Sequence, residues 1–389
     1  MPSGVTVRQA GPDDEVAGVR PRWVALPETT EEIAAVLKSA AERDLAVVPV
    51  GGGSKLHWGP PPERCDVLLD TCCLNQVVEH ASGDLVVKAQ AGVTMDALAD
   101  TLAAQGQELA LDVPVEGATV GGTLATATAG PRSLRYGTAR DLLIGITVVL
   151  ADGTVAHSGG KVVKNVAGYD LGKLFTGSYG TLGVIAEATF RLHPRAADRR
   201  WVTLSVPQAT ALGSIATGLA VSQAEPAAIE VDRPGDGAGV ELAVLVEGTA
   251  ARSRAESIAA LLGGPAAIEP RPPSWWGVLP DNQVLLEVRF PPSRADQVLQ
   301  ETLGLGAAVR GSPASGVLWL GGDERLVEAV PPLRKRLGEF GGRVTVVAAP
   351  PYPGLDRWGE ISALPLMRRV KERFDPGRRM SPGRFVGGI

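Results

Sequence analysis

The segment Gly51-Gly52-Gly53-Ser54 is the first part of this sequence whose residue types could bind a ligand. Three consecutive glycines let successive backbone N–H groups converge on one point, and this forms an anion site suited to a pyrophosphate. Ser54 adds a hydroxyl donor. An unliganded flexible turn is the alternative for this loop taken alone.

Neighbouring residues separate this loop from two common phosphate-binding motifs. In an NAD-binding Rossmann motif the glycine-rich loop opens a helix. Here Lys55 to Pro62 contains Trp58, Gly59 and three prolines, so no helix is expected to begin. Gly168 to Lys173 resembles a P-loop, but it is one residue short and lacks Ser or Thr after the lysine. The sequence therefore argues against the NAD-type motif, and the P-loop interpretation is rejected.

A second small-residue stretch, Val120 to Thr126, reads VGGTLAT. Its small side chains bury little apolar surface, so their presence needs a separate reason. A planar ring packed against bare backbone, with N–H groups reaching the ring carbonyls, supplies one reason. Close packing of a helix against a strand is the alternative.

Regular elements are expected to position both stretches. Thr29 and Glu32 form a capping-box pattern, and apolar residues at 33, 36, 37 and 40 mark one helical face. A buried strand, Leu45 to Val50, then ends in the glycine loop, and a further strand covers Val67 to Asp70. A hairpin is predicted through 82–84 into Leu85 to Gln90, followed by a helix from Met95 to Gln105.

The pattern continues with a hairpin around Asp152-Gly153, a short helix near Asp170 and a strand from Val184 to Leu192. From about 196 to 345, strand and helix patterns alternate in two β–α halves. This alternation predicts a smaller α+β domain of ferredoxin-like character. A last helix is expected over Leu364 to Phe374.

Composition excludes several classes of protein. The formal net charge of −5 gives no general reason to expect nucleic acid as a partner. No signal peptide and no run of 18 apolar residues appear, so no integral membrane segment is predicted. Cys65, Cys72 and Cys73 offer neither a disulfide framework nor metal-ligand spacing, which favours a cytoplasmic location and predicts no metal site.

The motifs together carry a resemblance to a known family. The first 195 residues resemble the FAD-binding domain of the vanillyl-alcohol-oxidase (PCMH-type) family. More narrowly, they resemble the E subunit of bacterial glycolate oxidases. The narrower resemblance rests on these motifs: Ala129-Gly130-Pro131-Arg132, Lys164 to Leu171, and Gly177-Ser178-Tyr179-Gly180, in which Tyr179 replaces the Glu usual in the D subunit. The tail with Phe374 to Gly377 and Ser381 to Arg384 is similar to the family's closing motif.

This resemblance implies an α+β fold with three parts. Residues 1–195 would form a two-part PCMH-type FAD-binding domain, 196–345 a smaller ferredoxin-like cap, and 346–389 a segment returning to the FAD domain. The implied cofactor is non-covalent FAD, because Gly53-Ser54 occupy the place where covalent relatives often have His. The implied cofactor residues are Val50, Gly51, Gly52, Gly53 and Ser54 for the pyrophosphate; Pro114, Thr119, Gly121, Gly122, Ala125 and Thr126 for the flavin; and Asp141, Gly183, Val184 and Ile185 near the adenosine end or closing the cavity.

Catalysis by this chain alone is a separate question. Catalytic relatives place histidines in the cap and just after it, whereas His57, His80, His157 and His193 all precede residue 196. The leading hypothesis is therefore an oxidoreductase subunit that carries FAD in a hetero-oligomeric enzyme oxidising glycolate or another small 2-hydroxy acid. Its implied partners are a sister flavoprotein subunit and an iron–sulfur subunit, through which the complex would touch the inner membrane face.

Two alternatives stay open. One is a self-sufficient FAD-dependent 2-hydroxy-acid dehydrogenase that uses a base other than histidine. The other is a non-catalytic assembly subunit. In each case the chain itself cannot ligate an iron–sulfur cluster, since three cysteines at this spacing are too few.

Overall fold

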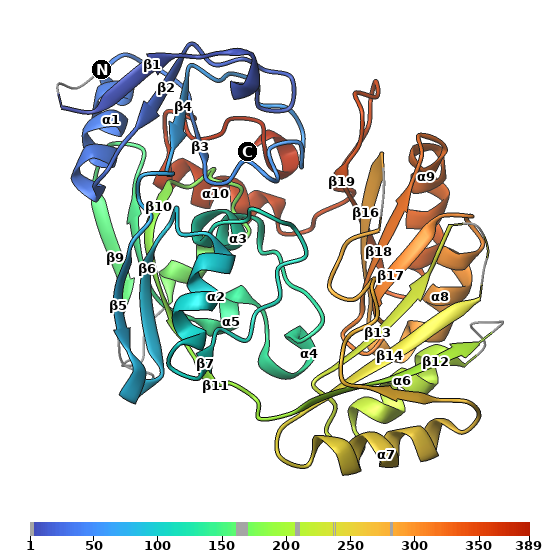
Figure 1. Cartoon of the computed structure of the whole chain (residues 1–389). Helices are drawn as coiled ribbons and strands as arrows, with labels where there is room; N and C mark the ends of the chain where they lie inside the picture. Colours follow the sequence, from blue (N-terminus) through green and yellow to red (C-terminus); the bar gives the residue numbers. More distant parts are fainter. Residues whose placement is uncertain (1–3, 161–169, 207–210, 236, 238, 281–282) are drawn as a thin grey trace. The chain divides into compact units, whose positions relative to one another are not determined.

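The computed structural model describes residues 4–160, 170–206, 211–235, 237, 239–280 and 283–389 (Figure 1). The chain divides into two compact units. The first unit comprises Met1–Thr128, Thr138–Arg195 and Ile361–Ile389, and the second comprises Ala129–Gly137 and Ala196–Glu360. The second unit thus reaches Glu360 rather than 345, and it also takes in the short segment 129–137.

A four-stranded sheet opens the first unit, in the order β1 (Thr6–Gln9), β2 (Trp23–Leu26), β4 (Val67–Asp70), β3 (Val47–Val50). The strands β2, β4 and β3 run parallel, and β1 is antiparallel to β2. Helix α1 (Thr30–Glu42) begins as predicted, because the Thr29 hydroxyl accepts a hydrogen bond from the Glu32 N–H. β3 delivers the chain directly to the glycine loop.

A five-stranded antiparallel sheet forms the rest of this unit, in the order β5 (Val77–Ala81), β6 (Val86–Gln90), β10 (Val184–Arg191), β8 (Leu143–Val149), β9 (Val155–Gly159). The hairpins predicted at 82–84 and at Asp152-Gly153 are confirmed. One apolar core joins both sheets to α1 and includes Ile33, Val149 and Met380.

The remaining short elements can be given by their bounds alone. They are α2 (Met95–Ala103), β7 (Gln107–Glu108), α3 (Val120–Thr126), α4 (Ser133–Tyr136), α5 (Ala139–Leu142), β11 (His193–Pro194), and single 3₁₀ turns at Pro12–Asp14, Ser82–Asp84, Leu171–Leu174, Pro292–Arg294 and Val386–Gly388. The turn at Leu171–Leu174 stands where a short helix was expected.

The second unit is built from two ferredoxin-like halves. The first half runs β12 (Arg199–Val206), α6 (Leu212–Ala220), β13 (Ala228–Arg233), β14 (Val240–Glu247), α7 (Ala251–Leu262), β15 (Ala267–Glu269). The second half runs β16 (Val284–Arg289), α8 (Ala295–Leu303), β17 (Ala308–Ser312), β18 (Val317–Gly322), α9 (Arg325–Gly338), β19 (Arg343–Ala348). Both halves follow the βαββαβ order, which confirms the predicted ferredoxin-like character. The unit contains this motif twice.

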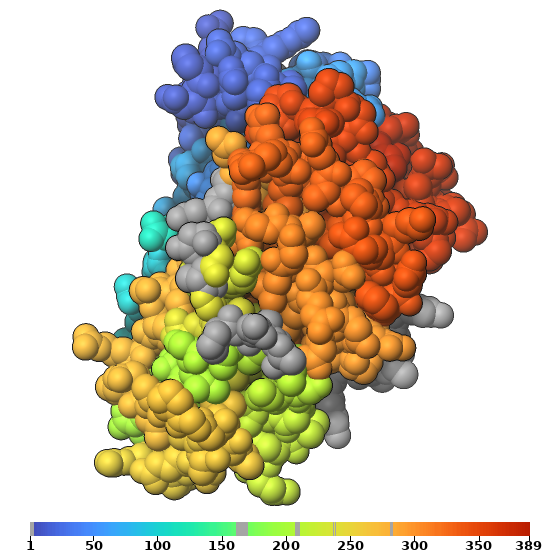
Figure 2. All heavy atoms as spheres, turned by 90° about the vertical axis from the view of Figure 1, so that its right-hand side faces the viewer, coloured from blue at the N-terminus to red at the C-terminus, as the bar shows by residue number. Residues whose placement is uncertain are grey.

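The two halves share a single eight-stranded sheet, in the order β15-β12-β14-β13-β17-β18-β16-β19. They join where β13 pairs antiparallel with β17. One core cluster contains buried side chains of both halves, among them Leu242 and Leu286. Figure 2 shows this unit from the side on which the residues of α8 and α9, in orange, make up much of the visible surface.

The last segment belongs to the first unit. Helix α10 (Leu364–Phe374) is followed by a stretch that adds to the edge of β3: the Val47 N–H donates to the Arg379 carbonyl, and the Ser381 N–H donates to the Val47 carbonyl. None of the helices in the described ranges has the length and apolar character needed to cross a bilayer.

Candidate cofactor site

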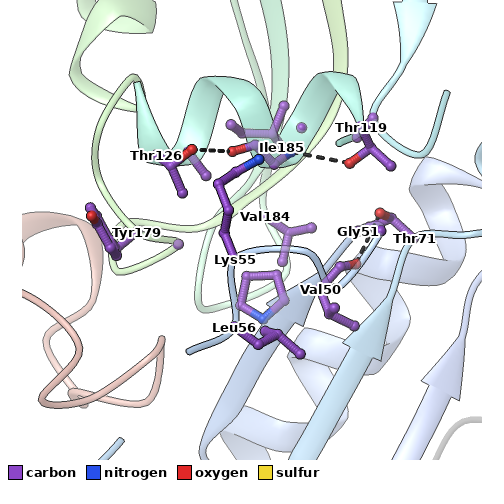
Figure 3. A pocket seen from close by; sticks show the side chains of 18 of the residues that line it. Val50, Gly51, Lys55, Leu56, Thr71, Thr119, Thr126, Tyr179, Val184 and Ile185 are labelled. Carbon is purple, nitrogen blue, oxygen red and sulfur yellow. Dashed lines mark hydrogen bonds between the residues drawn. The ribbon is translucent and has the colours of Figure 1, made fainter. Parts of the chain in front are cut away.

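A cleft in the first unit lies where β3 ends, between the glycine loop, helix α3 and the start of β10 (Figure 3). It encloses about 760 Å³ of space, counting its open side. Thirteen of the fifteen residues predicted to bind the cofactor line it together: Val50, Gly51, Gly52, Gly53, Ser54, Thr119, Gly121, Gly122, Ala125, Thr126, Gly183, Val184 and Ile185.

Close contact between the glycine loop and the 117–119 segment explains two of the glycines. A Cβ on Gly51 would lie 2.2 Å from the Thr119 hydroxyl oxygen, and one on Gly52 would lie 1.8 Å from the carbonyl oxygen of Gly117. Gly53 differs, because it adopts a φ of +70° with nothing closer to its Cβ position than 4.0 Å. The absence of side chains at 51 and 52 therefore lets the loop approach the 117–119 segment.

The glycine loop offers unused hydrogen-bond donors. Within the described residues, the backbone N–H groups of Gly51, Gly52, Gly53 and Ser54 donate to no protein acceptor. Gly51 and Ser54 are half-buried and Gly52 and Gly53 are exposed, so these N–H groups are open to solvent or to a ligand. A bound anion can accept hydrogen bonds from them together, so the donor set fits the phosphates of a dinucleotide.

Helix α3 forms the facing wall. The Thr119 hydroxyl accepts from the Gly122 N–H at 3.3 Å, and the Thr126 hydroxyl donates to the Gly122 carbonyl at 2.8 Å. A Cβ on Gly121 would lie 2.8 Å from the Ala91 Cβ, so close packing accounts for this glycine, as the alternative reading of the sequence held. A Cβ on Gly122 would have the Thr119 hydroxyl oxygen as its nearest neighbour, at 3.3 Å.

The start of β10 closes the third side. Gly183 has a φ of +155°, and a Cβ there would lie 2.6 Å from the Val149 carbonyl oxygen. Val184 and Ile185 follow as buried apolar residues. This side of the cleft is suited to an apolar or aromatic ligand surface.

Lys55 lines the cleft although the sequence analysis did not select it. The residue is only 7% exposed, and its Nζ has no hydrogen-bond partner in the described part of the chain. Figure 3 shows the side chain reaching from the loop toward helix α3. Burial lowers the pKa of Lys55 to about 8. The sequence feature that could have identified Lys55 is its position directly after the glycine loop and before Trp58.

Arg384 also lines the cleft, from the closing motif of the sequence. Its guanidinium donates to the carbonyl oxygens of Leu56 at 3.1 Å and Pro60 at 2.8 Å. Tyr179, the residue that distinguished the E-subunit motif, lines the cleft as well and contacts Phe385 through its ring. The C-terminal segment thus fixes the far side of the loop that carries Lys55.

Two predicted residues lie outside the cleft. Pro114 does not line it, and the Asp141 carboxylate instead accepts from the N–H and the hydroxyl of Thr138, both at 2.8 Å. These bonds cap the short helix α5, so a structural role explains Asp141. The motif residues Lys164 to Tyr169 lie outside the described residues.

The four histidines do not line the cleft. His80 Nε2 lies 2.9 Å from the Gln107 side-chain oxygen, and His157 Nδ1 lies 3.0 Å from the Thr147 hydroxyl. His57 follows the glycine loop, and its ring contacts the Trp58 ring edge-to-face, with the centroids 6.5 Å apart. In the described ranges, no group of three or more His, Cys, Asp or Glu side chains is arranged to hold a metal ion.

Comparison with known proteins agrees with this geometry. Residues 21–159 match the family described as "FAD binding domain". The chain is 38% identical over 184 residues to a D-lactate dehydrogenase of Archaeoglobus fulgidus, covering 47% of this chain and 41% of that protein. It is 39% identical over 170 residues to the mitochondrial D-2-hydroxyglutarate dehydrogenase of Bos taurus, covering 43% of this chain and 31% of that protein.

A third relative is the glycolate oxidase subunit GlcD of Bacillus subtilis, which is 32% identical over 216 residues, covering 55% of this chain and 46% of that protein. The matched regions therefore span less than half the length of these relatives. Among solved structures, p-cresol methylhydroxylase is similar with a TM-score of 0.74 at 16% identity, covering 94% of this chain and 88% of that one.

Alkyldihydroxyacetonephosphate synthase is similar in the same way, with a TM-score of 0.70 at 20% identity, covering 94% of this chain and 78% of that one. At these identities the likeness concerns the fold, and it confirms the predicted two-part α+β architecture. The chain therefore carries an FAD binding domain in residues 21–159, and FAD is the cofactor of this domain.

Proposed function

We propose that this chain is the FAD-binding subunit of a multi-subunit oxidoreductase that acts on a small 2-hydroxy acid such as glycolate. The observation that carries the proposal is the cleft that unites residues 50–54, 119–126 and 183–185. Relatives named for D-lactate, D-2-hydroxyglutarate and glycolate support the substrate class. Bound FAD would supply the hydride acceptor.

Each side of the cleft has a distinct proposed role. The N–H groups of 51–54 would hold the pyrophosphate, helix α3 would lie against the flavin, and Val184 and Ile185 would form an apolar wall. The proposed attachment is non-covalent, and none of the described residues that line the cleft is a histidine or a cysteine.

The subunit assignment rests on the distribution of reactive side chains. Residues 196–389 contain no histidine, although oxidation of a hydroxy acid needs a base near the substrate hydroxyl. Three cysteines are also too few to ligate an iron–sulfur cluster. Substrate oxidation would then fall to a sister flavoprotein subunit, and electrons would leave through an iron–sulfur subunit.

Flavin content and substrate reduction test the proposal. The purified chain should be yellow, and acid precipitation should release its FAD into the supernatant. Under anaerobic conditions, glycolate or D-lactate should leave the flavin absorbance unchanged until the partner subunits are added. Bleaching of the chain alone would instead identify a self-sufficient dehydrogenase. A colourless chain that assembles with partner subunits would identify an assembly subunit.

A further inference from the structure

Lys55 is a buried cation without a counter-charge in the part of the chain that the structure describes. Its Nζ lies beneath the surface and has no hydrogen-bond acceptor among the described residues. The Trp58 ring lies on one side of the ammonium group, with its centroid 5.9 Å from Nζ. Arg384, which also lines the cleft, is a cation, and the described residues that line the cleft include no carboxylate.

A buried, unpaired ammonium group destabilises the fold of the chain when no ligand is bound. A buried charge is ordinarily paired or neutralised, because losing water costs several kcal/mol per ion. Desolvation is the one cause that shifts the pKa of Lys55, so no carboxylate offsets it. The ammonium group is therefore arranged for an anion that comes from outside the chain.

The position of Lys55 indicates which anion that is. The residue directly follows Ser54, and its side chain enters the same cleft as the 51–54 loop with its unused N–H donors. We infer that Lys55 binds the phosphate groups of the dinucleotide and neutralises part of their charge, an assignment that rests on the FAD site proposed above. Arg384 holds the opposite end of the loop through the Leu56 and Pro60 carbonyls, which keeps Lys55 inside the cleft.

Comparing FAD with riboflavin tests this assignment, because riboflavin has the same ring without phosphates. Lys55→Met keeps the length of the side chain and removes its charge. Lys38→Met, on the exposed face of α1, is the matched control. The readouts are the dissociation constants of both flavins for flavin-free protein and the Tm of that protein without flavin.

A charge-assisted hydrogen bond is worth about 1.5–3 kcal/mol, so Lys55→Met should raise the Kd for FAD roughly 10- to 100-fold. The Kd for riboflavin should stay within about twofold. The Tm of the flavin-free variant should rise, because an unpaired buried charge has been removed. Lys38→Met should change none of the three.

Other outcomes would overturn the inference in distinguishable ways. An unchanged FAD affinity in Lys55→Met would remove Lys55 from the phosphate site while leaving the FAD proposal intact. Equal losses for FAD and riboflavin, or a lower Tm, would show that Lys55 supports the fold or the ring. If the wild-type chain bound neither flavin, the FAD site itself would be wrong.

Discussion

Titration of a single amine, that of Lys55, should make FAD binding depend on pH. Burial lowers the pKa of Lys55 to about 8, and a phosphate beside it would raise that pKa again. Above pH 8 the flavin-free chain holds a neutral amine, so binding must take up a proton. We therefore predict that the Kd for FAD rises roughly tenfold between pH 7 and pH 9, as measured by flavin fluorescence.

The neighbouring ionisable groups should not produce this dependence of the FAD dissociation constant on pH. Arg384 keeps its charge throughout the range. Burial, together with Arg384 and Lys55, lowers the pKa of His57, so His57 is neutral from pH 7 upward. Lys55→Met should consequently show a flat profile between pH 7 and pH 9. A variant with the wild-type slope would assign the proton to another group.

Two adjacent glycines should respond differently to substitution. Alanine at Gly52 would place a Cβ against the Gly117 carbonyl and force the two loops apart, whereas alanine at Gly53 meets open space but an unfavourable φ. We predict that Gly52→Ala abolishes tight FAD binding and lowers the unfolding free energy by about 1–3 kcal/mol. Gly53→Ala should cost about 1 kcal/mol and retain FAD. Urea unfolding and flavin content measure both, and equal effects at the two positions would contradict the steric account.

At the scale of elements, a buried ion pair holds the C-terminal segment against the cofactor domain. The Lys371 ammonium donates to Asp375 at 2.7 Å, to the Thr181 carbonyl at 2.7 Å and to the Met380 carbonyl at 2.8 Å. The Asp375 carboxylate also accepts from the Met380 N–H at 2.7 Å. Because Arg384 follows in the same segment, this pair positions one side of the cleft.

Removing one member of the pair should be more harmful than removing both. We predict that Asp375→Ala lowers the unfolding free energy by about 3–5 kcal/mol, since it leaves the Lys371 charge buried without its carboxylate. The double variant Asp375→Ala, Lys371→Met should lose less than the sum of the single variants. The exposed pair Arg252–Glu256 of α7 is the matched control. There, Glu256→Ala should cost less than about 1 kcal/mol, and a comparable loss at both pairs would show that burial is not the cause.

Elements with a strong local signal could be predicted from the sequence. The Thr29 cap located α1, and Asp152-Gly153 located the turn between β8 and β9. β1 and β2 were not predicted, since each has four residues and no clear alternation. At the site, the density of glycine predicted that the backbone of residues 50–54 and of residues 119–126 lines one cleft. Lys55 was not predicted, because only tertiary packing shows that this lysine is buried rather than solvated.

At the scale of the whole molecule, the second unit contains a large hydrophobic cluster that is shared by its two repeated halves. Leu242 in the first half and Leu286 in the second are both fully buried in that shared cluster. The continuous sheet through β13 and β17 adds main-chain hydrogen bonds between the halves. The two ferredoxin-like halves should therefore unfold together rather than separately.

Calorimetry can separate this behaviour from that of the cofactor domain. FAD at about 100 times its Kd should stabilise the first unit by about 2.7 kcal/mol and raise the Tm of its transition. Leu242→Ala and Leu286→Ala should each cost about 2–5 kcal/mol, and both should lower the Tm of one common second-unit transition. If the two substitutions moved different transitions, the halves would be separate folding units. If FAD moved the transition that responds to Leu242→Ala and left the other unchanged, the cofactor would bind the second unit instead.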